Sequence, residues 1–178
     1  YLQEPPMGAL LYAVELPPYG GDTLFANMHL AYETLSPTLQ GFLESLTLIQ
    51  NSAKAEVTRT REDRVKDDGT KPKALVAEHP AVITHPRTGR KALYVNAGHT
   101  ERFKELTMEE SEPLLKFLYA HQTRPEFTCR FTWTPGSLIF WDNYASQHNP
   151  INDYHGFKRV MHRVTVAGGR PSLVQVAE

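Results

Sequence analysis

The stretch F-T-C-R-F-T-W-T-P-G-S-L-I-F-W, at residues 127–141, carries the clearest indication of fold class in this chain. In its first half, apolar residues alternate with polar ones at a period of two, which is typical of a strand with one buried face. The alternating apolar residues are Phe127, Cys129, Phe131 and Trp133. Thr134-Pro135-Gly136 is a turn signal, and residues 137–141 form the next apolar run. We therefore predict two successive strands, with Cys129 in the core.

Comparable short apolar runs occur along the rest of the chain and are separated by turn residues. Pro17-Pro18 closes one run, because proline cannot donate to a strand ladder. Pro86-Arg87-Thr88-Gly89 is a hairpin signal between two further runs. Strands are expected at residues 10–16, 23–27, 81–84 and 92–96.

Two amphipathic helices are expected between these strands. Ser36-Pro37 supplies an N-cap and a proline at the first helical position. Thr107-x-x-Glu110 offers a capping box for the second helix. Ser111 is an alternative start, since Pro113 is best tolerated in a first turn. Several short strands with two helices laid on them indicate a β-sandwich or jelly roll with helical decoration.

Length and composition exclude several classes of protein. With 178 residues, 40% hydrophobic and 22% charged, the chain is expected to form a single globular domain over residues 1–178. A formal net charge of -1 argues against nucleic-acid binding. No apolar run approaches the roughly 20 residues of a membrane span. The single Cys129 excludes an intramolecular disulfide and a thiolate metal cluster, and it suits a reducing cytoplasm.

Residues 54–73 differ in character from the rest of the chain. Of these 20 residues, 12 are Asp, Glu, Lys or Arg of both signs, and apolar periodicity is almost absent. Such a composition is typical of a solvated, mobile segment. Two interpretations remain open, namely a surface loop and a lid that closes on a ligand.

Residues 141–163 hold the residues most suited to chemistry. If residues 158–166 form a strand, Arg159 and Arg163 share one of its faces, and His162 lies on the other, where a core position is expected. Two guanidinium groups on one face indicate either a surface in water or a pocket for anions. His148 precedes them in a polar loop and is either structural or a ligand.

A weak metal-site pattern is also present. His99-x-Glu101 followed by His148 has the composition of the two-histidine, one-carboxylate set of non-haem iron(II) oxygenases. With eight histidines and 20 acidic residues in the chain, such a match is expected by chance. His99 and Glu101 therefore remain a rival pair of ligands.

Specific motifs give the chain a resemblance to a known family. The first motif is P-P-M-G-A-L-L-Y-A-V-E-L-P-P-Y-G-G-D-T-L-F-A-N-M at residues 5–28. Four others follow in order: H-P-x-V at 79–82, T-H-P-R-T-G-R at 84–90, W-D-N-Y-A-S-Q-H at 141–148 and R-V-M-H-R at 159–163. Together they resemble the taurine dioxygenase (TauD/TfdA) family of iron(II)- and 2-oxoglutarate-dependent oxygenases, over nearly the whole chain. The resemblance implies a mainly β double-stranded β-helix, or jelly roll, with helical decoration.

The resemblance also assigns roles to single residues. His148 matches the distal iron ligand, and it is the one catalytic and metal-binding residue carried over. Arg159 and Thr23 match the residues that bind the far carboxylate of 2-oxoglutarate, while Arg163 matches the arginine that holds the substrate sulfonate. His99 matches a substrate-pocket position that is aromatic in taurine enzymes, which puts taurine itself in doubt. Tyr144 departs from the commoner W-D-N-R.

In the family, a His-x-Asp pair of iron ligands lies just ahead of the segment equivalent to Tyr1. We therefore expect that this chain lacks an N-terminal part with those two ligands. The implied protein is an iron(II)/2-oxoglutarate dioxygenase that uses dioxygen to hydroxylate a small anionic substrate: an alkylsulfonate such as taurine, a sulfate ester or an aryloxyalkanoate. A cytoplasmic homo-oligomer without membrane or nucleic-acid partners is expected.

Two other classes of function stay open at this point. A family member that begins at Tyr1 would bind a small anion and carry out no chemistry. An unrelated cupin-like binder of sugars or small acids is the third hypothesis.

Overall fold

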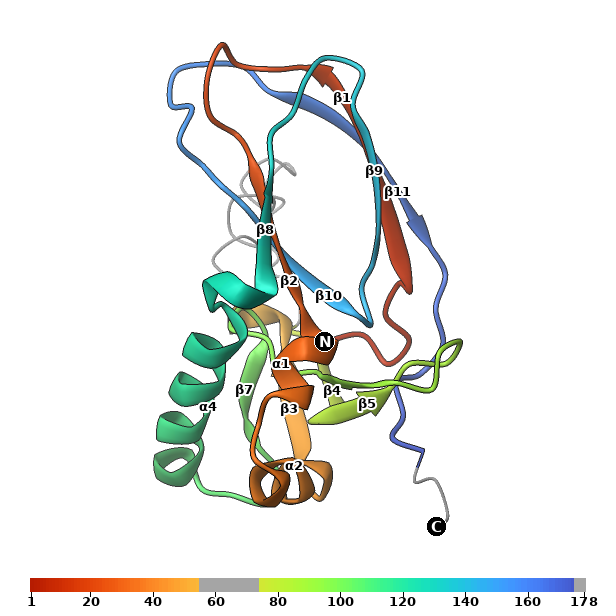
Figure 1. The fold of residues 1–178 in the computed structure, drawn as a ribbon, viewed down its shortest axis with the longest axis vertical. Helices are drawn as coiled ribbons and strands as arrows, with labels where there is room; N and C mark the ends of the chain where they lie inside the picture. Colours follow the sequence, from red (N-terminus) through yellow and green to blue (C-terminus); the bar gives the residue numbers. More distant parts are fainter. Residues whose placement is uncertain (55–73, 175–178) are drawn as a thin grey trace.

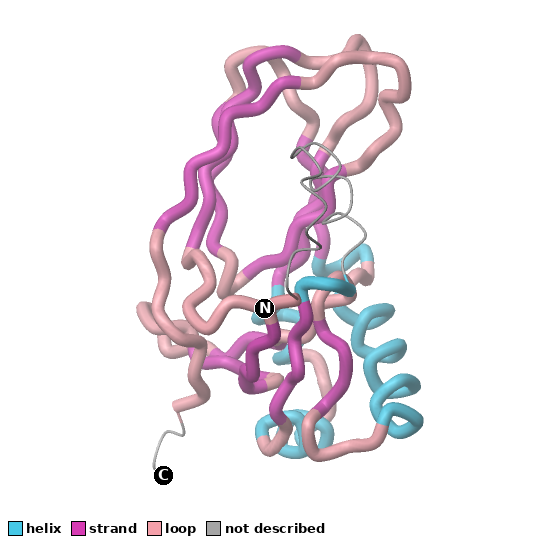
Figure 2. The backbone as a smooth tube through the Cα atoms, turned by 180° about the vertical axis from the view of Figure 1, so that it is seen from behind, coloured by secondary structure: helices cyan, strands magenta, loops and turns pink. Residues whose placement is uncertain are grey.

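The computed structural model describes residues 1–54 and 74–174 (Figure 1). Residues 55–73, which make up nearly all of the charged segment, lie outside the described residues, so its interpretation as loop or lid stays open. The described chain is mainly β, and helices gather at one end (Figure 2). The predicted fold class, mainly β with helical decoration, is confirmed.

Two antiparallel three-stranded sheets form one half of the molecule and face each other (Figure 1). The first has the order β11-β1-β9, with β11 at Val160–Val166, β1 at Gly8–Glu15 and β9 at Leu138–Asp142. The second has the order β10-β2-β8, with β10 at Ser146–Pro150, β2 at Thr23–Asn27 and β8 at Thr128–Phe131. Because β8 to β11 alternate between the two sheets, this half agrees with a jelly roll.

The other half holds the main hydrophobic core. Its elements are the sheet β4-β3-β7, the hairpin β5-β6 and the surrounding helices. Their bounds are β3 Thr47–Asn51, β4 Val76–Pro80, β5 Val82–Thr84, β6 Lys91–Leu93, β7 Thr100–Phe103, α1 Met28–Glu33, α2 Pro37–Glu44 and α4 Met108–Gln122, with the 3-10 turns η1 Ser52–Lys54 and η2 Pro125–Phe127. Leu43, Leu48, Ile83, Leu93, Phe103 and Leu118 are completely buried there. None of the described helices has the length and apolar character needed to cross a bilayer.

Helix starts follow the local capping signals. The Ser36 hydroxyl accepts a hydrogen bond from Leu39 N at 3.3 Å, and Pro37 opens α2. The capping box of Thr107 and Glu110 is present, so α4 begins at Met108 and the alternative start at Ser111 is wrong. Ser111 instead accepts a hydrogen bond from Phe103 N at 3.1 Å, which ties α4 to β7. Pro113 consequently lies inside the helix, beyond its first turn.

Two predictions about burial are wrong, and both errors concern the two facing sheets. Cys129 is exposed, although it pairs with Phe25 on the inner side of its sheet. His162 does lie on the strand face opposite Arg163, but that face is the outer side of its sheet. There it pairs with Tyr12, which is itself 43% exposed. Alternation along a strand identifies the two faces, but it does not say which face other residues cover.

Candidate functional site

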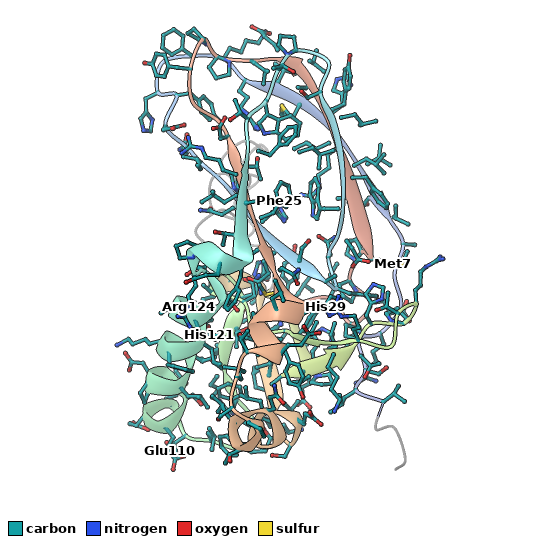
Figure 3. The ribbon with its side chains drawn as sticks, viewed as in Figure 1. Met7, Phe25, His29, Glu110, His121 and Arg124 are labelled. Carbon is teal, nitrogen blue, oxygen red and sulfur yellow. The ribbon has the colours of Figure 1, made fainter. Side chains whose placement is uncertain are left out.

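The candidate residues come from both facing sheets. Thr23 begins β2, and His148 lies in the neighbouring strand β10, where it pairs with Phe25. Arg163 lies in β11 of the other sheet, and Arg159 immediately precedes that strand. Phe25 points from β2 toward β9, and its ring centroid lies 5.6 Å from that of Trp141 (Figure 3). The structure therefore places these four residues around the space between the two sheets.

His148 lies in a strand, so its predicted place in a loop is wrong. The sequence S-Q-H-N-P has little strand character of its own, and its pairing with β2 supplies the extended conformation. The ring centroid of His148 lies 4.8 Å from Trp141 and 6.3 Å from Phe25. Part of the His148 side chain is open to solvent. Its pKa is nevertheless lowered to about 4, mainly because the ring loses hydration and also because the positive charge of Arg163 is near. The resulting neutral imidazole is the form that binds metal ions.

Arg159 is held in an unusual environment. Its guanidinium carbon lies 5.7 Å from the ring centroid of Trp133 and 5.8 Å from that of Tyr154. Its Nε and Nη2 atoms are buried and have no hydrogen-bond partner among the described residues. Since buried polar groups are almost always paired, such orphaned donors indicate a place for an acceptor from a ligand. A carboxylate fits a guanidinium particularly well.

Thr23 completes this environment. Its side chain is 3% exposed, and its hydroxyl accepts a hydrogen bond from Trp133 Nε1 at 3.0 Å. A hydroxyl that accepts in this way keeps its own proton for another acceptor. Trp133 therefore contacts both Thr23 and Arg159, the two residues that the family resemblance assigns to 2-oxoglutarate. The hydroxyl and the guanidinium both suit a carboxylate.

The turn before Thr23 is fastened on two sides. Asp22 accepts hydrogen bonds from Arg130 Nε at 2.7 Å and from the Thr132 hydroxyl at 3.0 Å. The bond from Arg130 is the main reason why the pKa of Asp22 is lowered. Gly21 N donates to Asp153 Oδ1 at 2.7 Å, which joins the turn to the segment that carries Tyr154. The position of Thr23 is thus set by contacts from two other segments.

Arg163 lies apart from Arg159. Its guanidinium carbon is 5.7 Å from the ring centroid of Trp141, and it pairs across the sheet with Leu11. The Arg163 side chain is exposed, and its positive charge contributes to the lowered pKa of His148. Each arginine therefore contacts a different tryptophan, and Arg163 is the one next to the candidate iron ligand.

His99 and Glu101 lie in the other half of the molecule. Glu101, in β7, accepts a hydrogen bond from the Asn51 side chain at 3.0 Å. The Nδ1 atom of His99 is buried and has no hydrogen-bond partner within residues 1–54 and 74–174, and burial lowers the pKa of this side chain. Across residues 1–54 and 74–174, no three His, Cys, Asp or Glu side chains form a group suited to a metal ion. His99, Glu101 and His148 thus do not form the rival iron site among the described residues.

The motifs T-H-P-R-T-G-R and W-D-N-Y meet beside the site. His85 Nε2 lies 2.8 Å from Asp142 Oδ2, and its Nδ1 accepts from Thr88 N at 3.2 Å. Asp142 Oδ1 accepts from the backbone N–H groups of Tyr144 and Ala145, which forms the turn into β10. These bonds connect the β5-β6 hairpin to the strand that carries His148.

The sequence reasoning missed the residues around Arg159. Tyr154 lies in a polar loop and gives no signal, and Trp133 was seen as the last residue of a strand pattern. Gly21 stands in the motif at residues 5–28, but its φ of 75° and its closeness to Arg159 are features of the folded chain.

Comparisons with known proteins point to one family. Residues 1–165 match the family model described as taurine catabolism dioxygenase TauD, TfdA family. An alkylsulfatase from Acinetobacter baylyi is 36% identical over 170 residues, covering 92% of this chain and 53% of that protein. An alpha-ketoglutarate-dependent sulfate ester dioxygenase from Pseudomonas putida is 33% identical, with 96% and 58% covered. The chain thus spans about half the length of the curated relatives it matches.

Solved structures show the same likeness. A taurine dioxygenase from Burkholderia xenovorans has a TM-score of 0.81 and 38% identity, covering 95% of this chain and 55% of that one. The structure of AAD-2 in complex with Mn(II) and N-oxalylglycine has a TM-score of 0.83 and 29% identity, with 97% and 67% covered.

Proposed function

Because the chain belongs to the taurine catabolism dioxygenase TauD, TfdA family, we propose that it is part of an iron(II)- and 2-oxoglutarate-dependent dioxygenase. The observation that carries the proposal is Arg159, with two buried donors that lack a hydrogen-bond partner among the described residues. The far carboxylate of 2-oxoglutarate would accept from them and from the Thr23 hydroxyl. The cupin-like alternative is wrong, since the family match covers residues 1–165.

His148 would contribute to the iron site as a neutral imidazole. The described residues do not complete an iron site, so the remaining ligands have to come from elsewhere in the protein. Iron(II), when bound, would activate dioxygen as the oxidant, and 2-oxoglutarate would supply two of the electrons. Overall, substrate C–H, 2-oxoglutarate and dioxygen give an alcohol, succinate and carbon dioxide. This chain's own residues bind and orient the reactants, which is catalysis largely by positioning.

Arg163 would bind the anionic group of the primary substrate. It lies next to His148 and faces the same space between the sheets, so an anion held there would place its neighbouring carbon near the metal. We propose alkylsulfonates, sulfate esters and aryloxyalkanoates as the substrate class. The relatives from Acinetobacter baylyi and Pseudomonas putida support sulfate esters as one member of this class. His99 stays a prediction as a substrate-pocket residue.

The test is 2-oxoglutarate-dependent oxygen uptake by the full-length protein with iron(II) and ascorbate. The panel comprises alkylsulfonates, alkyl sulfate esters and aryloxyacetates, and succinate, sulfite and sulfate are measured as products. Turnover of at least one class is expected, and its loss in Arg159→Ala is the matched control. No 2-oxoglutarate-dependent turnover of any of these substrates would favour the remaining alternative, a family member that binds a small anion without chemistry.

Reading the residues ahead of Tyr1 distinguishes the same two hypotheses at little effort. A His-x-Asp pair immediately upstream supports the enzyme. The single-domain organisation of residues 1–178, the cytoplasmic location and the homo-oligomeric state stay predictions.

A further inference from the structure

Arg159 is held by aromatic rings, and no carboxylate among the described residues forms an ion pair with it. Asp153, which adjoins Tyr154, and Asp22, which adjoins Gly21, bind other groups. Asp153 accepts from Gly21 N, and Asp22 accepts from Arg130 and Thr132. Within the described chain, Arg159 thus contacts two ring faces and has no paired carboxylate.

A ring face and a carboxylate hold a guanidinium in different ways. A ring attracts the cation through its quadrupole and leaves the N–H groups at the edge of the guanidinium unused. A carboxylate accepts from those same N–H groups and neutralises the charge. The first arrangement keeps an arginine available for an anionic ligand, whereas the second makes the ligand compete with a protein group.

We infer that Trp133 and Tyr154 form an aromatic clamp that positions Arg159 for the far carboxylate of 2-oxoglutarate. This inference rests on the proposed function, and it names two positioning residues for the same site. Trp133 has a second part in it, because its indole N–H fixes the Thr23 hydroxyl at 3.0 Å. One side chain thereby orients both groups that would bind the carboxylate.

Gly21 explains how the guanidinium can lie so close to the backbone. A Cβ atom at this position would be 3.1 Å from Arg159 Nε, 3.2 Å from its Cδ and 3.3 Å from the Tyr154 ring. A side chain at this position would displace Arg159 and Tyr154 from their places beside the backbone. The clamp thus has two aromatic rings and a glycine that leaves room for the cation.

The test measures ligand binding and does not rely on turnover. Isothermal titration calorimetry on the full-length protein with Mn(II) gives Kd for 2-oxoglutarate and for 2-oxopentanoate, which has the same oxo acid but no far carboxylate. Tyr154→Leu is expected to weaken 2-oxoglutarate binding about fivefold, from the usual strength of a cation–π contact. The affinity for 2-oxopentanoate should stay within about twofold, because Arg159 does not bind it. Tyr154→Phe keeps the ring and should restore most of the affinity.

A second variant tests the other half of the clamp. Trp133→Phe keeps a ring near Arg159 but removes the N–H that binds Thr23. Its loss of 2-oxoglutarate affinity is also expected to be about fivefold, the usual effect of one hydrogen bond. This variant preserves most of the buried ring volume, so it tests positioning with little change to the core.

The binding results decide whether Trp133 and Tyr154 position Arg159. Weaker binding of 2-oxoglutarate alone in Tyr154→Leu, with rescue by Tyr154→Phe, supports the clamp. Equal weakening of both ligands would show a merely structural role and overturn it. If the wild type binds 2-oxoglutarate and Arg159→Gln abolishes the preference over 2-oxopentanoate, unchanged binding in Tyr154→Leu overturns the clamp and leaves the proposed function intact. A wild type that does not bind 2-oxoglutarate at all overturns both.

Discussion

His85 donates a hydrogen bond from its Nε2 to Asp142 Oδ2 over 2.8 Å, and this bond joins the β5-β6 hairpin to the turn before β10. The Nδ1 atom of His85 accepts backbone N–H groups, so the proton of the neutral ring is on Nε2. His85 is 5% exposed, whereas Asp142 is partly open to solvent. The strand that carries His148 is therefore fastened to the other half of the molecule through a buried histidine.

Replacing His85 tests this connection. His85→Ala should lower the free energy of unfolding by about 1–3 kcal/mol, because it removes a buried imidazole together with its hydrogen bonds to Asp142 and to the N–H groups of Arg87 and Thr88. Urea denaturation followed by circular dichroism measures the change. His162→Ala is the matched control, since His162 is exposed on the outer face of its sheet, and it should change stability by less than about 0.5 kcal/mol. Equal effects of the two substitutions would contradict the assigned role of His85.

Arg159 and Arg163 are expected to affect different ligands. Arg159→Ala should raise the 2-oxoglutarate concentration required for half-maximal rate by about 30-fold or more, because a charged hydrogen-bond donor in a buried site is lost. Arg163→Ala should mainly raise KM for the primary substrate. Steady-state kinetics with each reactant varied in turn separates the two effects. An equal effect of both substitutions on one reactant would be inconsistent with this division.

Gly21 and Gly136 make a matched pair of glycines. Both have a positive φ, 75° and 82°, but a Cβ on Gly136 would meet no atom of the described part of the chain within 4 Å. Each Gly→Ala change should cost about 1–2 kcal/mol of stability through backbone strain. Only Gly21→Ala should also weaken 2-oxoglutarate binding, because its methyl group meets Arg159. Thermal unfolding and calorimetric titration measure the two effects. Weaker binding in Gly136→Ala would show that backbone strain alone is responsible.

The lowered pKa of Asp22 leads us to expect that the free energy of unfolding depends on pH. The hydrogen bond from Arg130 is the main cause that lowers its pKa in the folded protein below the ordinary value near 3.8. A carboxyl with a depressed folded pKa contributes stability above its unfolded pKa and loses that contribution as the pH falls through the folded pKa. The stability difference between wild type and Asp22→Asn should thus be largest near neutral pH and shrink below about pH 4. Urea unfolding from pH 3 to 7 measures it, and a constant difference would contradict the assignment.

Local signals explain which parts of the fold were predictable. The strand at residues 23–27, the caps at Ser36 and Thr107 and the hairpin around residues 86–89 each depend on a few adjacent residues, and all are confirmed. The strand β10 was missed because the pairing with β2 supplies its extended conformation. Cys129 and His162 were misplaced because burial depends on what covers a sheet, which strand alternation does not contain.

The candidate site divides in the same way. Family motifs pointed to Thr23, His148, Arg159 and Arg163, and the structure gathers them around one space. Trp133, Tyr154 and Gly21 lie far apart in sequence, and their contact with one guanidinium is a product of tertiary packing. No local pattern contains such a contact.

The distribution of the candidate ligand-binding residues over two sheets also has a consequence for folding. Thr23 and His148 belong to one sheet and Arg163 to the other, while Arg159 ends the segment that joins β10 to β11. Reactants bound by all of these residues would connect the two sheets to each other. By mass action, a ligand that binds only the assembled pair stabilises that assembly. Bound reactants would thus stabilise the association of the two sheets, and product release would remove that stabilisation.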